Sequence, residues 1–264
     1  MKIGVSTASL YPLHAEDAFR ELAVRGIKTA EVFANSTSEA REPVTGMILD
    51  TANEHKMEIT SFHPFSSPME SVFLFSTYDR RIDEMMTLYR EFFGSMVRLG
   101  AKIFVLHGAI LSSKCPPEHY MRQFRLLAQA GREYGVTVAQ ENVSYCMSGD
   151  LDFLKLMKRE LGEYAKFVLD LKQSRRSHID PFDIIHELGE NIVHLHISDG
   201  SGDRDCLPVG HGDFDFRRLM REMSATGYSG AYIVELYRQN YDTFDRLKES
   251  CDRLCEYAQC LGTG

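Results

Sequence analysis

The chain has 264 residues, 44% of them hydrophobic and 26% charged, as in an ordinary globular protein with a sizeable core. The net charge is −8 and no run of basic residues is longer than a pair, so bulk electrostatics indicate no nucleic-acid partner. No stretch approaches the roughly 18 apolar residues of a membrane span, and the N-terminus has no long apolar region. We therefore expect a cytoplasmic protein with no membrane partner.

Strand-like and helix-like segments alternate along the whole chain. Short runs rich in β-branched and aromatic residues favour strands, and longer amphipathic segments that stop at a glycine favour helices. The predicted strands are 2–7, 28–33, 57–63, 102–107, 136–141, 166–170, 191–196 and 231–235. The predicted helices are 15–25, 39–55, 79–99, 116–134, 150–160, 181–188, 215–226 and 241–260.

Strict alternation predicts a parallel sheet, and eight strand–helix pairs in roughly 250 residues fit one (β/α)₈ TIM barrel. A doubly wound open sheet is the competing architecture, but no GxGxxG follows the first strand. No linker rich in Pro, Gly or Ser divides the chain. We expect a single domain over residues 1–264, and a monomer and a homo-oligomer both remain open.

The fifth to eighth strands each end on a residue that can bind a metal. These residues are Glu141, Asp170, His196 and Glu235. In a closed parallel barrel they share the face that carries the chemistry. Three carboxylates and one imidazole suit Mn²⁺ or Mg²⁺ better than a thiolate-rich set would, and Zn²⁺ and Co²⁺ are alternatives. One acidic strand end alone is explained by a helix N-cap or a salt bridge. Four successive strands that each end on a potential ligand favour a metal site.

Strand parity extends this prediction below the ligands. If Glu141 points into the barrel mouth, Ala139 lies beneath it, Val168 lies beneath Asp170, and His194 lies beneath His196. We interpret His194 as interior packing with a satisfied ring nitrogen.

Further polar side chains are predicted near the same face. His63 and His107 end the third and fourth strands, and we expect substrate contacts or an accessory metal position there. Gln173 lies just beyond the sixth strand, where an amide can bond a hydroxyl group. Arg204 is a candidate for gripping a substrate oxygen, with a salt bridge in its own loop as the alternative. His211, between two glycines, is a further candidate contact.

The four strand ends resemble a known family. QEN, VLDLKQ, HLHISD and IVELY contain the four candidate ligands, and they resemble the metal site of the sugar phosphate isomerases/epimerases, within the xylose-isomerase-like barrels. The likeness spans the chain, from MKIGVST to PVGHGDFDF. It implies one divalent ion, commonly Mn²⁺, that binds two vicinal oxygens of an open-chain sugar. It also implies that Glu141 and Glu235 are both ligands and acid/base groups.

The implied reaction moves a proton next to the carbonyl of a sugar or sugar derivative. Such a proton is too weakly acidic for a carboxylate alone, and a metal that holds the developing enediolate lowers the barrier. An inosose-type dehydratase would use the same proton abstraction and then expel water. A barrel that binds a sugar without turnover is the non-enzymatic alternative. For the two glutamates, the alternative is that both only hold the metal and the base lies elsewhere.

The same superfamily contains endonuclease IV, a DNA-repair phosphodiesterase with three zinc ions. The chain keeps His63, His107 and Glu141, which resemble part of that site. It has Gln173 where the nuclease has a zinc-binding histidine, and Asp-Arg-Asp at 203–205 near the nuclease's Asp-Arg-His. A phosphodiesterase is therefore a minor alternative.

Overall fold

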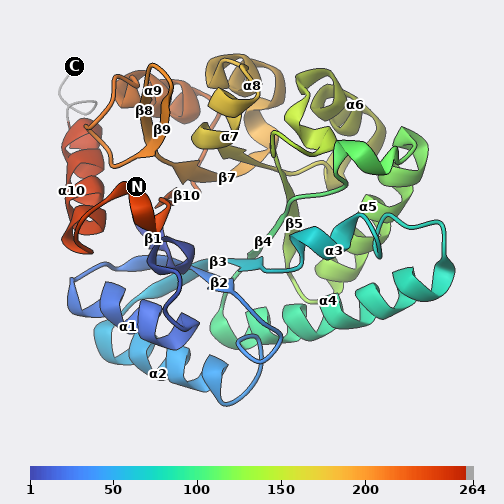
Figure 1. Cartoon of the computed structure of the whole chain (residues 1–264), viewed down its shortest axis with the longest axis horizontal. Helices are drawn as coiled ribbons and strands as arrows, with labels where there is room; N and C mark the ends of the chain where they lie inside the picture. The colour runs from blue at the N-terminus through green and yellow to red at the C-terminus, as the bar shows by residue number, and fades with distance from the viewer. Residues whose placement is uncertain (260–264) are drawn as a thin grey trace.

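Eight parallel strands close into a barrel in the computed structural model, which describes residues 1–259. Around the barrel the order is β1-β10-β7-β6-β5-β4-β3-β2, and helices surround it (Figure 1). The predicted (β/α)₈ architecture is confirmed. The barrel strands are β1 (Lys2–Ser6), β2 (Thr29–Ala34), β3 (Glu58–Pro64), β4 (Ile103–Leu106), β5 (Thr137–Glu141), β6 (Phe167–Asp170), β7 (Ile192–Ile197) and β10 (Ala231–Val234).

Eight helices follow the eight barrel strands. Each long helix buries one apolar face, as α4 does with Tyr89, Phe92 and Phe93. The helices are α1 (Ala15–Val24), α2 (Val44–His55), α4 (Asp79–Leu99), α5 (Pro117–Glu133), α6 (Leu151–Leu161), α8 (Pro181–Leu188), α9 (Phe216–Ala225) and α10 (Asp245–Gln259), with short α3 (Ser67–Glu70) and α7 (Leu171–Arg176) between them. Within residues 1–259, none of the helices is long and apolar enough to cross a membrane.

The structure departs from the predicted elements in three places. Helix α2 begins at Val44 rather than at residue 39, because Pro43 disfavours helical backbone in the residue before it. An unpredicted antiparallel hairpin, β8 (Asp199–Ser201) and β9 (Arg204–Leu207), follows β7. The last helix begins at Asp245 rather than at residue 241, and its predicted end, Cys260, lies outside the described residues.

The barrel interior forms a small apolar cluster of its own. Val105, Ala139 and Val168 pack together apart from the main core, which fills the space between the strands and the helices. Ala139 and Val168 are the residues that parity placed beneath Glu141 and Asp170. The apolar layer closes the barrel below these carboxylates, so their charges lie at its carboxyl-end mouth.

Candidate metal centre

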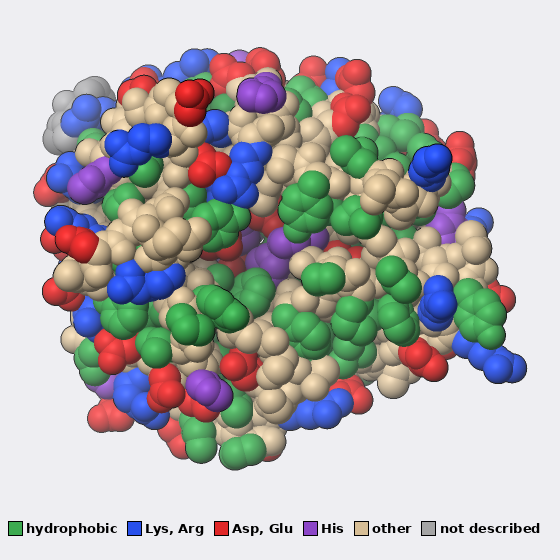
Figure 2. Space-filling view, in the orientation of Figure 1, with side chains coloured by type: hydrophobic (Ala, Val, Ile, Leu, Met, Phe, Trp, Pro, Cys, Tyr) green, Lys and Arg blue, Asp and Glu red, His purple; other side chains and the backbone are tan. Residues whose placement is uncertain are grey.

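A cavity of about 380 Å³ opens at the carboxyl-end face of the barrel. Figure 2 shows histidine surface in a hollow near the middle of this face. The cavity wall includes five of the residues that the sequence predicted for the site: His63, His107, Glu141, Gln173 and Glu235. The two other predicted ligands, Asp170 and His196, are buried next to it and are each 1% exposed.

The three predicted carboxylate ligands converge on the Nδ1 atom of the fourth ligand, His196. That atom lies 3.0 Å from Glu141 Oε1, 2.9 Å from Glu235 Oε2 and 3.7 Å from Asp170 Oδ2. One ligand atom from each of the four residues lies within 4.8 Å of the others. Strands β5, β6 and β7 and the residue after β10 therefore bring three carboxylates and one imidazole to one small volume.

The carboxylates of this group carry buried oxygens that make no well-formed hydrogen bond among the described residues: Glu141 Oε2, Asp170 Oδ2 and Glu235 Oε2. Their close charged or polar neighbours are His107 Nε2 at 2.9 Å, Lys172 Nζ at 3.0 Å and His196 Nδ1 at 2.9 Å, respectively. Three buried carboxylates in one small volume concentrate negative charge, and Mn²⁺ and Mg²⁺ favour oxygen ligands. The residues present thus fit a divalent ion.

Asp170 combines the two roles that the sequence left open. Its Oδ1 accepts a hydrogen bond of 2.9 Å from the backbone N–H of Gln173 and so caps the N-terminus of α7. Its Oδ2 caps no backbone N–H, faces the other ligands at 3.7 Å from His196 Nδ1, and lies 3.0 Å from Lys172 Nζ. A helix N-cap and a candidate metal ligand therefore coexist in one side chain.

His63 and His107 form a second group on the same carboxylate. The Nε2 atoms of the two rings are 2.9 Å apart, and His107 Nε2 lies 2.9 Å from Glu141 Oε2. His63 Nδ1 lies 3.2 Å from the carbonyl oxygen of Pro64, and His107 Nδ1 lies 3.3 Å from the hydroxyl of Tyr145. Glu141 thus belongs both to this group and to the four-ligand group.

Lys172 is a buried cation beside the ligands. Its Nζ lies 3.0 Å from Asp170 Oδ2 and 3.8 Å from Glu235 Oε1, above the ring of Tyr237. The side chain is 4% exposed and lines the cavity. Burial lowers its pKa, but the charges of Asp170 and Glu235 outweigh this and raise the pKa well above its ordinary value. The cavity therefore contains a positive charge at neutral pH.

The other predicted contacts divide into two places. Gln173 lines the cavity, and its Oε1 accepts hydrogen bonds from the backbone N–H and the hydroxyl of Ser144, which leaves its amide N–H groups as donors. Arg204 and His211 line a separate surface depression together with Tyr241. The structure does not bring Arg204 and His211 to the carboxylate cavity, and their role as substrate contacts stays a prediction without support from this geometry.

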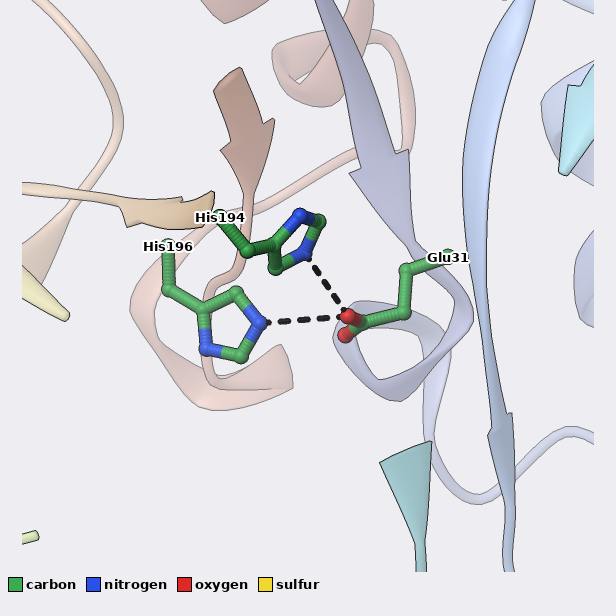
Figure 3. Close-up of side chains that lie close together, drawn as sticks. All are labelled: Glu31, His194 and His196. Atoms are coloured by element: carbon green, nitrogen blue, oxygen red, sulfur yellow. Dashed lines mark hydrogen bonds and ion pairs between the residues drawn. The ribbon is translucent and has the colours of Figure 1, made fainter. Parts of the chain in front are cut away.

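The sequence reading missed Glu31. This carboxylate lies in the middle of β2, and its Oε2 is 3.0 Å from His194 Nε2 and 3.2 Å from His196 Nε2 (Figure 3). His194 Nε2 also lies 3.1 Å from the hydroxyl of Ser61, so the expected interior histidine with a satisfied ring nitrogen is confirmed. A charged residue inside an otherwise apolar buried strand was the available indication, because such a charge needs a buried partner.

The electrostatics of the group favour positive charge at His196. Burial lowers the pKa of His196, but the negative charges of Glu31 and Glu235 outweigh it and hold the pKa well above its ordinary value. Burial raises the pKa of Glu235, whereas Lys172 and His196 lower it more, to about 2. The site therefore holds ionised carboxylates, which stabilise positive charge at the ring.

The protein is a (β/α)₈ barrel with a candidate metal centre, because its closed parallel barrel brings three carboxylates and an imidazole together at its mouth. The chain belongs to the xylose isomerase-like TIM barrel family, whose model matches residues 18–257. An uncharacterized protein of Mycobacterium leprae is 24% identical over 268 residues, with 89% of each chain covered.

Solved structures named as sugar epimerases and a dehydratase share the fold. A D-tagatose 3-epimerase-like protein superposes with a TM-score of 0.81 at 17% identity and covers 99% of this chain and 98% of its own. A D-psicose 3-epimerase crystallised with D-fructose gives 0.80 at 13% identity, with both chains fully covered. A probable 3-DHS dehydratase of Bacillus anthracis gives 0.76 at 16% identity and covers 97% and 99%.

Proposed function

We propose that the protein is a metal-dependent isomerase or epimerase that moves a proton next to the carbonyl of a sugar or sugar derivative. The observation that carries the proposal is the convergence of Glu141, Asp170, His196 and Glu235, with buried carboxylate oxygens, beside an open cavity. The epimerase names of proteins with the same fold support a sugar as substrate.

The four converging residues would hold one divalent ion, Mn²⁺ by preference for this ligand set. Such an ion, when bound, supplies Lewis acidity that makes a proton next to a carbonyl easier to remove. Glu141 and Glu235 act as proton acceptor and donor. Their oxygens lie 3.0 and 2.9 Å from the same nitrogen of His196, so both glutamates are next to the proposed metal position. Lys172 and His196 hold the pKa of Glu235 at about 2, so this carboxylate is ionised at neutral pH.

The cavity wall supplies groups that suit a polyhydroxylated ligand. Lys172 and the amide of Gln173 are donors, and His63 and His107 can each bond a hydroxyl group. Tyr237 adds an apolar ring face to the same wall. Substrate oxygens would thus be oriented from several sides while the reacting carbon lies between the glutamates.

An inosose-type dehydratase is the second candidate, and Lys172 is the observation that favours it. An elimination removes a proton from one carbon while the C–O bond of the neighbouring carbon breaks, and the departing hydroxyl leaves as water. The Lys172 ammonium, 3.8 Å from Glu235 Oε1, can donate to the departing oxygen while the glutamate takes the carbon-bound proton.

The test is deuterium incorporation from D₂O into a panel of ketoses, aldoses and inososes, with Mn²⁺-loaded protein. Glu141→Gln and Glu235→Gln should each reduce exchange about 10²–10⁴-fold and keep the fold, because a carboxamide cannot take the proton. The matched control is Glu58→Gln, which changes an exposed glutamate paired with Lys2 at the opposite end of the barrel.

Product masses separate the candidates. An epimerase or isomerase product keeps the substrate's mass apart from deuterium, whereas a dehydratase product loses one water. Near-normal exchange in both glutamate variants would refute the two-glutamate mechanism. Tight binding of a sugar with no exchange would identify a binding protein instead.

A further inference from the structure

We propose that Glu31 is a positioning residue for the candidate metal ligand His196. Its carboxylate accepts the Nε2–H of that ring and so directs the lone pair of Nδ1 toward Glu141, Asp170 and Glu235. The inference rests on the metal centre proposed above and deepens it, since Glu31 itself does not line the cavity or touch the reacting atoms.

The two nitrogens of the His196 ring face different groups. Nδ1 lies 2.9–3.0 Å from the nearest oxygens of Glu141 and Glu235, whereas Nε2 lies 3.2 Å from Glu31 Oε2. A neutral imidazole has one N–H and one lone pair, and an ionised carboxylate is only an acceptor. A proton on Nε2 satisfies Glu31 and leaves Nδ1 free to bind a cation, whereas the other tautomer would aim a lone pair at Glu31.

His194 holds the Glu31 carboxylate in place. Both rings point at the same oxygen from β7, while Glu31 reaches them from β2 (Figure 3). His194 Nε2 lies 3.0 Å from that oxygen and 3.1 Å from the Ser61 hydroxyl. All of these side chains are at most 1% exposed, so water cannot readily replace one of them. The carboxylate therefore has one well-defined position behind the ring.

The charge on Glu31 also needs compensation. Its Oε1 is buried with no hydrogen-bond partner in the described part of the chain, and its close contacts are the two imidazoles. A divalent ion on the far side of the His196 ring would supply positive charge through a carboxylate–histidine–metal arrangement. Glu31 and the ion would then stabilise each other across the ring, although they do not touch.

The decisive variant is Glu31→Gln, which keeps the size of the side chain and removes its charge. Loss of such an outer partner commonly costs 10–100-fold in metal affinity, and we expect a loss of about that size for Mn²⁺. Glu58→Gln removes one negative charge at the opposite end of the barrel and should leave the affinity unchanged within about twofold, because exposed distant charges are screened.

The experiment titrates Mn²⁺ into chelator-treated, full-length wild-type protein and the two variants at about pH 8, where protons compete less for the histidine. We expect that the wild type and Glu58→Gln bind Mn²⁺ with similar affinity and that Glu31→Gln alone binds it clearly more weakly. Equal affinity in wild type and Glu31→Gln would overturn the inference and leave the metal centre intact. No Mn²⁺ binding by the wild type would overturn the metal centre, and the inference with it.

A second measurement does not depend on how the variant folds. Wild-type protein labelled with ¹⁵N-histidine and loaded with diamagnetic Zn²⁺ reports which ring nitrogen of His196 carries a proton. A protonated Nε2 and a metal-bound Nδ1 are expected. The reverse assignment would overturn the positioning role, because Glu31 would then face a nitrogen without a proton.

Discussion

Removal of the metal should lower the thermal stability of the protein, and Asp170→Asn should abolish most of that dependence. Asparagine is as good a helix N-cap as aspartate, so the cap on α7 is retained. The variant loses the negative charge on the atom that corresponds to Oδ2, which faces the other ligands and lies 3.0 Å from Lys172 Nζ; a comparison of each protein with and without Mn²⁺ cancels the loss of that ion pair. The substitution therefore separates the metal-binding role of this residue from its capping role.

The magnitude follows from the linkage between binding and unfolding. At a free Mn²⁺ concentration 100 times the Kd, binding to the folded state adds about 2.7 kcal/mol to the free energy of unfolding. For a chain of this size each kcal/mol shifts the Tm by about 2–4 °C, so the wild type should gain about 5–10 °C. If the lost ligand weakens binding about 100-fold, the same Mn²⁺ concentration adds only about 0.4 kcal/mol, or about 1 °C.

The assay compares melting curves of wild type and Asp170→Asn with Mn²⁺ and with excess chelator. Circular dichroism of the folded proteins at low temperature checks that α7 and the barrel remain. A shift of the same size in both proteins would place the stabilising ion elsewhere. A wild type that melts identically with and without Mn²⁺ would refute the argument from the buried carboxylates.

Two further predictions concern charge and packing. Lys172→Met should tighten Mn²⁺ binding by about tenfold or more, because it removes a buried positive charge beside the ligand carboxylates. Unchanged or weaker Mn²⁺ binding in a metal titration would contradict this prediction. Gly4→Ala should lower the free energy of unfolding in urea by about 1–3 kcal/mol, because a Cβ there would lie 2.2 Å from the carbonyl oxygen of Thr29 in the adjacent strand. Gly94→Ala is its matched control: no described atom lies within 4 Å of the new Cβ, and alanine in the interior of α4 should stabilise by about 1 kcal/mol. Equal effects of the two glycine variants would be inconsistent with the packing of the barrel.

The fold was predictable because local pattern and topology agree. Every barrel strand is a short, largely buried run that contains apolar residues, and helices such as α4 stop at a glycine in the left-handed conformation, as at Gly100. The hairpin of β8 and β9 was not predictable from pattern, since each strand is only three or four residues long and partly polar. Strands that short have no periodicity to detect.

The candidate site was predictable for the residues that lie at the carboxyl ends of the strands. Glu141, Asp170, His196 and Glu235 converge because parallel strands bring their carboxyl ends to one face. Glu31 was missed because it lies in the middle of its strand and its partners are more than 160 residues away in sequence. Pairing across a barrel interior depends on strand order and register, which one sequence does not reveal.

Protons and metal ions should compete for the same atom of His196. In the metal-free protein, Glu31 and Glu235 hold the pKa of His196 well above its ordinary value, so Nδ1 carries a proton at neutral pH. A cation must displace that proton, and Mn²⁺ affinity should therefore rise with pH, by up to about tenfold per unit, until the pH passes the His196 pKa.

Glu31 affects both the pKa of His196 and the affinity of the site for Mn²⁺. It is the largest contributor that raises the His196 pKa, so Glu31→Gln should shift the rise in affinity to lower pH while lowering the plateau. The deficit of the variant should thus widen as pH increases, which Mn²⁺ titrations between about pH 6 and 9 would reveal. A deficit independent of pH would mean that Glu31 does not raise the pKa of His196 in the metal-free protein. An affinity that falls as pH rises would mean that His196 does not bind the metal through Nδ1.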